Sequence, residues 1–447
     1  ILLLGVYNLY SFFSYTVYLT DNMDIYDSIK SVILSKMVRM NKKMVGIEEE
    51  CIIYSSDYRR IPVNVCDQFS ASDLVLYMND NSKDNGVYTL EPGGQLEWSS
   101  PPFRNLNNLQ KSYNKHQALL ELISKKHGLH IIYFGVEPQY DPDDIDLINQ
   151  LKYQLMNNNM EKNGQLGKWM MRNTSSIQVN YDISSEKDLE EMVFIADCLH
   201  PICAYLFSNS PFKNKKLTGL KNIRNIIWEN TDKSRSGNLM DHGIKSPQNL
   251  LDSYIKYIMN VPGIFQLNTN GNIEDTNQTL GQRLNELNNL GILKTDDIQA
   301  ALHQIFTNVR LKNLVEIRGA DRPPKGYEMA PVAFWIGLLT EKSVREEILS
   351  IIIKWSISDR NKLNKAANSL DSSQTGPDDR SYGYWNKWIG EMAIKGLNLR
   401  GYNESHLFKN YFNIVLKNGP LGIQTQNAFK VCDKTFNHFI IKPEICI

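Results

Sequence analysis

Carboxylate and amide side chains stand at alternate positions in four distant segments of the sequence. Apart from Glu49, the residues between them are apolar, and this period-two alternation predicts β-strands with one apolar face and one polar face. The polar positions are Glu48 and Glu50 in segment 45–53; Gln95, Glu97 and Ser99 in segment 95–99; Ser176, Gln178, Asn180 and Asp182 in segment 175–183; and Glu316 and Arg318 in segment 314–321.

A sheet face that collects carboxylates needs a positive partner, because like charges on neighbouring strands destabilise a sheet. Strands with one solvated face are common, but such faces usually mix in lysine and threonine, and these four carry no lysine. Oxygen ligands without cysteine or histidine favour Mg²⁺ or Mn²⁺, which often bridge to nucleotide phosphates. Arg318 would then be a fixed cation for a transferring phosphoryl group. The residues expected to hold the metal are Glu48, Glu50, Glu97 and Glu316.

The expected chemistry is therefore ATP-dependent, although the sequence contains no Walker-type or kinase-type glycine-rich loop. The eight histidines form no pair with metal-ligand spacing, so a histidine-based metal site is not indicated. The cation expected at the polar face is thus a hard ion that binds oxygen.

Residues 88–100, YTLEPGGQLEWSS, are predicted to be extended, with an interruption at Glu91-Pro92-Gly93-Gly94. Pro92 fixes the backbone, and the two glycines permit a bulge or a close approach of another backbone. Two interpretations remain open for this interruption, a plain turn and a loop that admits a ligand.

Helical spacing of apolar residues predicts the elements that must carry these strands. Residues 106–126 and 330–356 have this spacing, and residues 185–207 have it after a capping pattern of Ser185 with Asp188. The polar stretches 265–283 and 361–380 are predicted to be loops. No linker divides the chain, so we expect one domain over residues 25–447 after an apolar N-terminal extension, residues 1–24.

Composition limits the partners. Of the 447 residues 42% are hydrophobic, and 49 basic residues balance 49 acidic ones, so no overall charge recruits nucleic acid or an anionic membrane. The six cysteines include no CxxC pair, which favours a reducing compartment, and we expect the cytoplasm. The apolar start lacks a basic leader and is interrupted by polar residues, so a buried helix or a partner-contact surface is favoured over a membrane span.

The order of motifs resembles that of a known family. Two segments, GIEEE and YTLEPGGQLEWSSPP, resemble the acidic strands of the glutamate-cysteine ligases of the plant and proteobacterial type. The later segments that fall in that family's order are GQLGKWMMRNTSSIQVNYD, NSPFKNKKLTGLKNIRNIIWENTDKSRSG, ALHQIFTNVRLKNLVEIRGAD and APVAFWIGLL. The resemblance runs from about residue 25 to residue 420. It implies an α+β fold like that of glutamine synthetase, in which helices surround a central, mainly antiparallel sheet with a polar catalytic face.

The resemblance also implies an activity, the ATP-dependent joining of the glutamate γ-carboxylate to the cysteine amine, which is the first step of glutathione synthesis. In that family a γ-glutamyl phosphate forms first, and the amine then displaces phosphate. Arg318 and Glu316 would be catalytic. Substrates would meet Arg235, Arg224, Trp228, Gln178, Asn180 and Glu91, the last also a weaker metal candidate, and ATP would meet Arg318, Arg310 and Gln95.

Segment 149–153, Asn-Gln-Leu-Lys-Tyr, departs from the family pattern because it has lost a basic residue. A γ-glutamyl ligase with another amine acceptor therefore stays open. So does a relative without turnover that binds nucleotide or a protein partner. The expected partners are glutamate, cysteine and ATP, with a second copy of the chain as one option for assembly.

Overall fold

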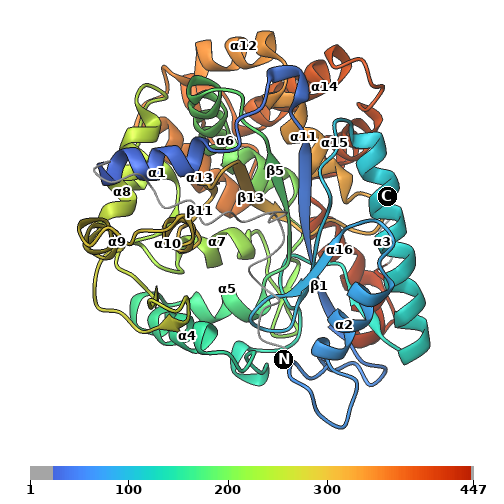
Figure 1. Cartoon of the computed structure of the whole chain (residues 1–447). Helices are drawn as coiled ribbons and strands as arrows, with labels where there is room; N and C mark the ends of the chain where they lie inside the picture. The colour runs from blue at the N-terminus through green and yellow to red at the C-terminus, as the bar shows by residue number, and fades with distance from the viewer. Residues whose placement is uncertain (1–23, 444–447) are drawn as a thin grey trace.

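An antiparallel β-sheet of seven strands lies at the centre of the molecule (Figure 1). The computed structural model of the protein describes residues 24–443. The strand order is β12-β13-β5-β1-β3-β2, and β4 pairs with the far end of β1. The strands are β1 (Val45–Tyr54), β2 (Val87–Leu90), β3 (Leu96–Ser99), β4 (His130–Ile132), β5 (Ser176–Tyr181), β12 (Val309–Leu311) and β13 (Val315–Asp321).

This architecture confirms the predicted α+β class, the antiparallel sheet and the four strands with alternating faces. The predicted extended segment 88–100 is a hairpin, because the interruption at Glu91 to Gly94 is a turn that joins β2 to β3. Its closing bonds run from the Gly94 N–H to the Glu91 carbonyl at 2.8 Å and from the Glu91 N–H to the Gln95 carbonyl at 2.9 Å.

The strand register aligns the polar positions in rows across the sheet. Glu50 of β1 pairs with Glu97 of β3, and Thr89 of β2 follows Glu97 in the same row. Glu48 lies between Ser99 of β3 and Gln178 of β5. A third row contains Asn180, Glu316 and Arg310. Since side chains alternate across a pleated strand, these three rows share one face.

The opposite face is apolar and packs against helices. Buried residues such as Ile47, Val179 and Ile317 belong to the main hydrophobic core. Helix α6 (Glu186–Leu206) contacts β13, and α11 (Met329–Leu339) contacts β5. Helix α11 is apolar along its whole length and buried on every side, because α14 (Tyr382–Leu399) and α15 (His406–Asn418) cover it.

One carboxylate lies on the apolar face. Glu49 points away from Glu48 and Glu50, and the side chains around it satisfy its charge. Arg322 contacts it at 2.8 Å, and His116 and Tyr113 of α3 (Leu106–His127) each lie 2.7 Å from it. Burial alone would raise its pKa, but Arg322 and His116 outweigh burial and lower the pKa of Glu49 to about 2.

Other elements enclose the polar face. They include α4 (Leu151–Asn163), α5 (Gly167–Asn173) and α7 (Ile223–Glu229), with α4 beside β10 (Ile273–Glu274) and α5 beside α7. The sheet therefore lies between an apolar layer of helices and a more irregular layer of short helices and hairpins.

The predicted helices and loops are partly confirmed. Residues 106–126 and 185–207 form α3 and α6, and the Ser185 side chain caps α6 by accepting from the Asp188 N–H. The single helical stretch 330–356 is two helices, α11 and α12 (Lys342–Ile352), because the chain turns at residues 340–341.

The predicted loops are wrong in part. Residues 361–369 belong to α13 (Ile357–Ser369), and residues 265–283 contain the β9–β10 hairpin and the start of α9. The remaining elements are α1 (Ile25–Leu34), α2 (Ala71–Asn81), α8 (Leu250–Asn260), α9 (Leu280–Asn289), α10 (Thr295–Leu302), α16 (Leu421–Val431), α17 (Phe436–Ile441), β6 (Phe212–Lys213), β7 (Lys216–Leu217), β8 (Ser236–Gly237), β9 (Gln266–Leu267) and β11 (Phe306–Thr307).

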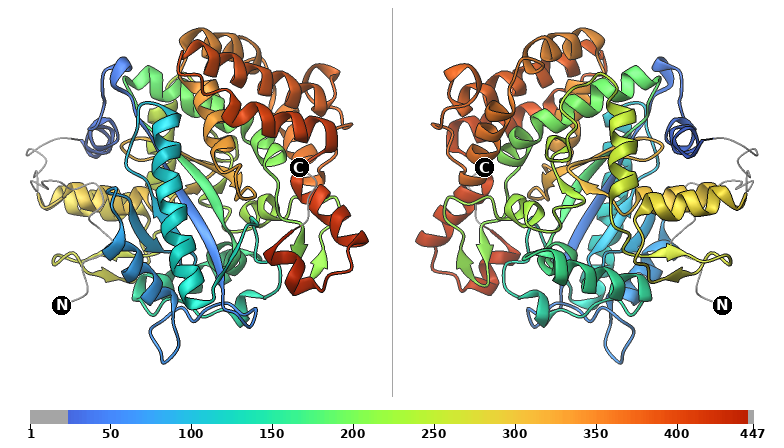
Figure 2. Two further views of the ribbon diagram at one scale, coloured as in Figure 1. Left: turned by 90° about the vertical axis from the view of Figure 1, so that its right-hand side faces the viewer. Right: turned by 90° about the vertical axis from the view of Figure 1, so that its left-hand side faces the viewer.

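In both views of Figure 2 most of the C-terminal helices, drawn orange to red, lie at the top of the molecule, and the last, dark red ones lie lower, at one side. Among residues 24–443, no helix combines the length and the apolar character needed to cross a membrane. The prediction made for the apolar start falls on residues 1–23, which lie outside the described residues, as does Cys446. The other five cysteines lie within residues 24–443 and are free thiols.

Candidate active site

Three carboxylates meet on the polar face. Glu50 comes from β1, Glu97 from β3 and Glu91 from the turn between β2 and β3. One carboxylate oxygen of each lies within 4.8 Å of the other two. We call these residues the carboxylate trio. Glu48 lies one row further along the same face, and the amide of Asn180 donates to its Oε1 at 3.0 Å.

The trio is electrostatically strained without a cation. Burial and the nearby charge of Glu91 raise the pKa of Glu50 to about 7. Burial and the charges of Glu48, Glu91 and Glu50 raise the pKa of Glu97 well above its usual value, although the Thr89 hydroxyl donates to Glu97 at 2.7 Å. Carboxylates in this state gain stability from a cation held between them.

A cationic group lies beside the trio. Arg310, Lys312 and Arg318 all contact Glu316, with 2.7 Å between Arg310 Nη2 and Glu316 Oε1. Although burial works in the other direction, these three cations hold the pKa of Glu316 well below its usual range. Glu316 was expected to share a metal with the other acids, but it lies among cations and outside the trio.

Gln178 joins the acidic and basic groups. Its Nε2 donates to Glu50 Oε1 at 2.8 Å, and its Oε1 accepts from Arg318 Nη1 at 3.0 Å. The side chain of Gln178 is buried, so both bonds form away from bulk water. A carboxylate and a guanidinium are thus held on either side of one amide.

A small recess, with a cavity volume of about 10 Å³, opens next to Arg318. Arg224 and Trp228 of α7 line it, and the guanidinium carbons of Arg224 and Arg318 lie 5.7 Å and 5.1 Å from the Trp228 ring centre. Arg224 Nε and Trp228 Nε1 are buried and find no hydrogen-bond partner within residues 24–443. Two cations and two unsatisfied donors make this recess suited to an anionic ligand.

Arg235, also predicted to meet a substrate, does not line this recess. Its side chain is fully buried, and its guanidinium donates to Asp232 at 2.7 Å and to the carbonyls of Gln304 and Pro262 at 3.2 Å and 2.6 Å. A substrate would have to displace these partners. The amide nitrogen of Gln95 also has a protein partner, because it donates to the Thr174 carbonyl at 3.0 Å.

Three basic groups near the site were not assigned from the sequence. Lys312 contacts Glu316. Burial, followed by the positive charges of Lys312 and Arg310, lowers the pKa of His303 well below its usual value. Burial lowers the pKa of Lys152, which feels the charges of Glu91 and Glu97. Lys312 follows Arg310 by two residues, so strand alternation could have placed it on the polar face.

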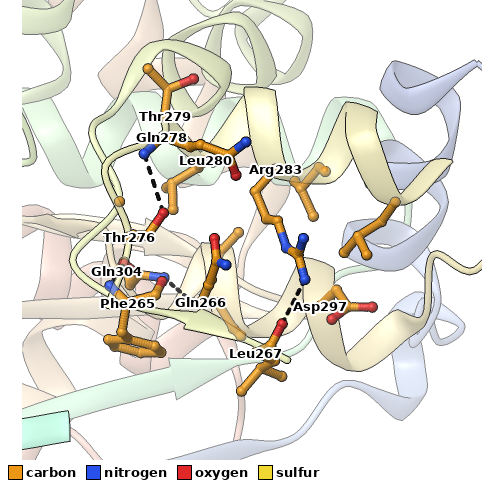
Figure 3. A pocket seen from close by; sticks show the side chains of 15 residues that line it. Phe265, Gln266, Leu267, Thr276, Gln278, Thr279, Leu280, Arg283, Asp297 and Gln304 are labelled. Atoms are coloured by element: carbon orange, nitrogen blue, oxygen red, sulfur yellow. Dashed lines mark hydrogen bonds between the residues drawn. The ribbon is translucent and has the colours of Figure 1, made fainter. Parts of the chain in front are cut away.

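A second small recess, with a cavity volume of about 20 Å³, lies between the β9–β10 hairpin and helices α9 and α10 (Figure 3). Arg283 crosses it and donates to the Leu267 carbonyl at 2.9 Å. Its lining contains Phe265 and Gln304 but none of the residues predicted to bind metal, nucleotide or substrate. The predicted site residues that lie together are therefore found at the trio and at the recess beside Arg318.

Comparison with known proteins finds glutamate-cysteine ligases, both by family and by individual relatives. The model of the family described as glutamate-cysteine ligase family 2 matches residues 44–388. The chloroplastic glutamate–cysteine ligase of Brassica juncea is 33% identical over 322 residues, which cover 71% of this chain and 62% of the relative. That of Arabidopsis thaliana is 33% identical over 337 residues, covering 74% and 63%. The chain thus spans about three fifths of the length of these relatives.

Solved structures show a similar fold. A glutamate–cysteine ligase from Francisella tularensis in complex with AMP has a TM-score of 0.57 at 12% identity, covering 91% of this chain and 88% of that one. A bifunctional glutathione synthetase from Pasteurella multocida has a TM-score of 0.51 at 11% identity, covering 93% and 53%. At such identities the likeness concerns the fold alone.

Proposed function

This chain belongs to glutamate-cysteine ligase family 2, and we propose that it joins the γ-carboxylate of L-glutamate to the amine of L-cysteine at the expense of ATP. The observation that carries the proposal is the division of one sheet face into an acidic and a basic half. The carboxylate trio forms the acidic half, and Arg310, Lys312 and Arg318 form the basic half, with Gln178 between them.

The donor set of the trio fits a divalent cation. Three carboxylate oxygens converge, no cysteine or histidine belongs to the cluster, and the raised pKa values of Glu50 and Glu97 report charge that a cation would neutralise. Mg²⁺ or Mn²⁺ bound there would screen the phosphates of ATP from an approaching anion. We assign Glu50, Glu91 and Glu97 to this ion and keep Glu48 as a further ligand.

The basic half suits phosphoryl transfer to a carboxylate. That reaction brings two anions together, and fixed cations that face the developing charge lower its barrier. Arg318 is best placed, since it adjoins both Gln178 and the recess. Glu316 would act by orienting Arg310, Lys312 and Arg318, in place of the metal-binding role expected from the sequence.

Recognition of a substrate carboxylate is assigned to the donors that line the recess beside Arg318. Arg224 offers a guanidinium with an unsatisfied Nε, and Trp228 offers a flat ring and an unsatisfied N–H. A carboxylate can accept two bonds from a guanidinium, which fixes the substrate's orientation. The γ-carboxylate of glutamate would then point toward the phosphates, a γ-glutamyl phosphate would form, and the cysteine amine would displace phosphate.

The remaining assignments belong to the same proposal. Residues 25–447 would form one catalytic domain, and the protein would work in the cytoplasm on small molecules, whereas the plant relatives are named as chloroplastic. The changed segment 149–153 begins α4, where Lys152 lies near the trio, so an acceptor other than cysteine is the second candidate.

Phosphate release tests both candidates. Purified protein with ATP and Mg²⁺ is assayed with glutamate, with cysteine and with both, and we expect release only with both. Release with glutamate plus another amine, but not cysteine, would establish the second candidate. Nucleotide binding without release for any amine would contradict both and support a binding protein without turnover.

A further inference from the structure

Glu91 is the one member of the carboxylate trio that does not lie in a strand. Pairing between β1 and β3 places Glu50 opposite Glu97, so the sheet fixes those two. The position of Glu91 depends on the turn at residues 91–94. Something other than strand pairing must hold this turn in place.

The turn packs directly against another backbone. A Cβ atom on Gly93 would lie 2.6 Å from the Cα and 2.7 Å from the carbonyl oxygen of Arg172 in α5, so no larger residue fits there. The Pro92 carbonyl accepts from the Ile148 N–H at 2.9 Å. Gly94 adopts φ 77°, a left-handed conformation that glycine reaches without strain.

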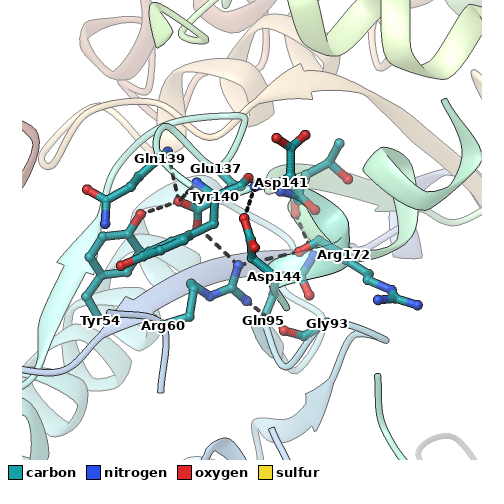
Figure 4. A network of polar contacts seen from close by, with 12 residues as sticks. Tyr54, Arg60, Gly93, Gln95, Glu137, Gln139, Tyr140, Asp141, Asp144 and Arg172 are labelled. Carbon is teal, nitrogen blue, oxygen red and sulfur yellow. Dashed lines mark hydrogen bonds and ion pairs between the residues drawn. The ribbon is translucent and has the colours of Figure 1, made fainter. Parts of the chain in front are cut away.

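The guanidinium of Arg60 ties the turn down (Figure 4). Its Nη2 donates to the Gly93 carbonyl at 2.6 Å, and its Nη1 donates to Glu137 Oε2 at 3.1 Å and to the Arg172 carbonyl at 3.4 Å. The Arg60 side chain is only 8% exposed. One buried cation therefore joins the turn, the end of α5 and a buried carboxylate.

Glu137 in turn is anchored to the strand that carries Glu50. Its Oε1 accepts from the hydroxyl of Tyr54, at the end of β1, and from the Gln139 N–H at 3.0 Å. Both carboxylate oxygens of Glu137 are thus engaged, and its side chain is completely buried. A continuous chain of contacts runs from β1 through Tyr54, Glu137 and Arg60 to Gly93.

These contacts oppose a repulsive force. One carboxylate oxygen each of Glu50, Glu91 and Glu97 lies within 4.8 Å of the other two, so their negative charges repel one another before a cation binds. A turn free to move would relieve the repulsion by carrying Glu91 away. A turn held by Arg60 keeps the ligand where a cation needs it.

We propose that Arg60 and Glu137 are positioning residues that hold Glu91 in the carboxylate trio and thereby set the affinity for the divalent cation. The proposal rests on the proposed function, since it takes the trio as the metal site. Groups that orient metal ligands in this way typically contribute about 10- to 100-fold to affinity.

The test is Mn²⁺ binding by titration calorimetry, without nucleotide or amino acids, for the wild type, Arg60→Gln and Arg59→Gln. Arg59 is the neighbouring arginine, 77% exposed, and pairs with Asp57 at the surface. We expect Arg60→Gln to weaken binding about tenfold or more, and Arg59→Gln to bind as the wild type does. Arg60→Lys should fall between them, because one ammonium cannot reach all three acceptors.

A double-mutant cycle separates positioning from general damage. With Glu91→Gln already present, Arg60→Gln should cost little further affinity. A second tenfold loss on that background would overturn the proposal, as would wild-type affinity in Arg60→Gln itself. If Arg60→Gln does not fold, Glu137→Gln replaces it, and wild-type affinity in that variant would equally overturn the proposal. Failure of the wild type to bind Mn²⁺ would instead count against the metal site of the proposed function.

Discussion

Glu50 and Glu97 lie directly opposite each other on β1 and β3, an arrangement that is unfavourable when both carry charge. The turn brings Glu91 to the same place, and within residues 24–443 no lysine or arginine forms an ion pair with the trio; Arg318 is linked to Glu50 through Gln178. The opposing side chains therefore work against the stability of the sheet unless a cation lies between them. Their replacement should separate folding from activity.

Glu97→Gln should abolish metal-dependent phosphate release while leaving the free protein as stable or more stable. The amide keeps the size of the side chain and removes one repelling charge, which should add about 0.5 kcal/mol to the unfolding free energy measured by urea without metal. Turnover should fall about 100-fold or more. Glu346→Gln on α12 is the surface control. Loss of the fold together with activity would make Glu97 structural.

Glu316→Gln should behave in the opposite way. Three cations surround this carboxylate, and its neutralisation leaves them buried or half-buried without a counter-charge. We expect the unfolding free energy to fall by about 3 kcal/mol, measured by urea at neutral pH. Stability equal to that of Glu97→Gln would show that the two acids share one role, as the sequence alone had indicated.

Two arginines should separate recognition from folding. Arg224→Lys keeps the charge in the recess but loses the guanidinium geometry, so the KM for one amino acid should rise about tenfold with little change in stability. Arg235→Lys should instead lower the unfolding free energy by about 2 kcal/mol, because three buried acceptors lose a partner, with KM values unchanged. Separate KM values for glutamate, cysteine and ATP decide the matter. A raised KM in Arg235→Lys would restore it as a substrate residue.

Glu328, the residue before α11, should make stability depend on pH. Burial, followed by the charge of Glu49, raises its pKa from 4.5 to about 7, while Arg322 partly offsets this. A carboxyl with a raised folded pKa contributes stability below pH 4.5 that is lost as the pH rises through 7. Relative to Glu328→Gln, the wild type should therefore lose up to about 3 kcal/mol between pH 5 and pH 8 in urea titrations. Parallel pH profiles for the two proteins would contradict this.

The sequence predicted which side chains share a face, because alternation along a strand is a local property. It placed Glu48, Glu50, Gln178, Asn180 and Glu316 correctly on one face of a sheet. It could not show that Glu316 is enclosed by cations, since two of those cations come from the neighbouring hairpin strand and the residue that follows it. Pairing between strands decides such contacts.

Two other differences between prediction and structure had a local signal in the sequence. Residues 361–380 contain few apolar side chains, so a loop was predicted, yet Ser356 and Asp359 form a capping box that starts α13. Asp232 lies three residues before Arg235 and hinted at an ion pair. The role of Arg60 had no such signal, because its partners Gly93, Glu137 and Arg172 are brought together only by the tertiary fold.

The run Glu48-Glu49-Glu50 does not by itself specify which face of β1 packs against the apolar core. A slip of β1 by one residue would still present glutamate to both sides of the sheet, so the acidic run carries little information about alignment. After such a slip Glu48 and Glu50 would both face the apolar layer, where Arg322, His116 and Tyr113 satisfy one carboxylate, that of Glu49, in the native alignment. The native alignment is thus favoured because it buries one acid with its partners and not two.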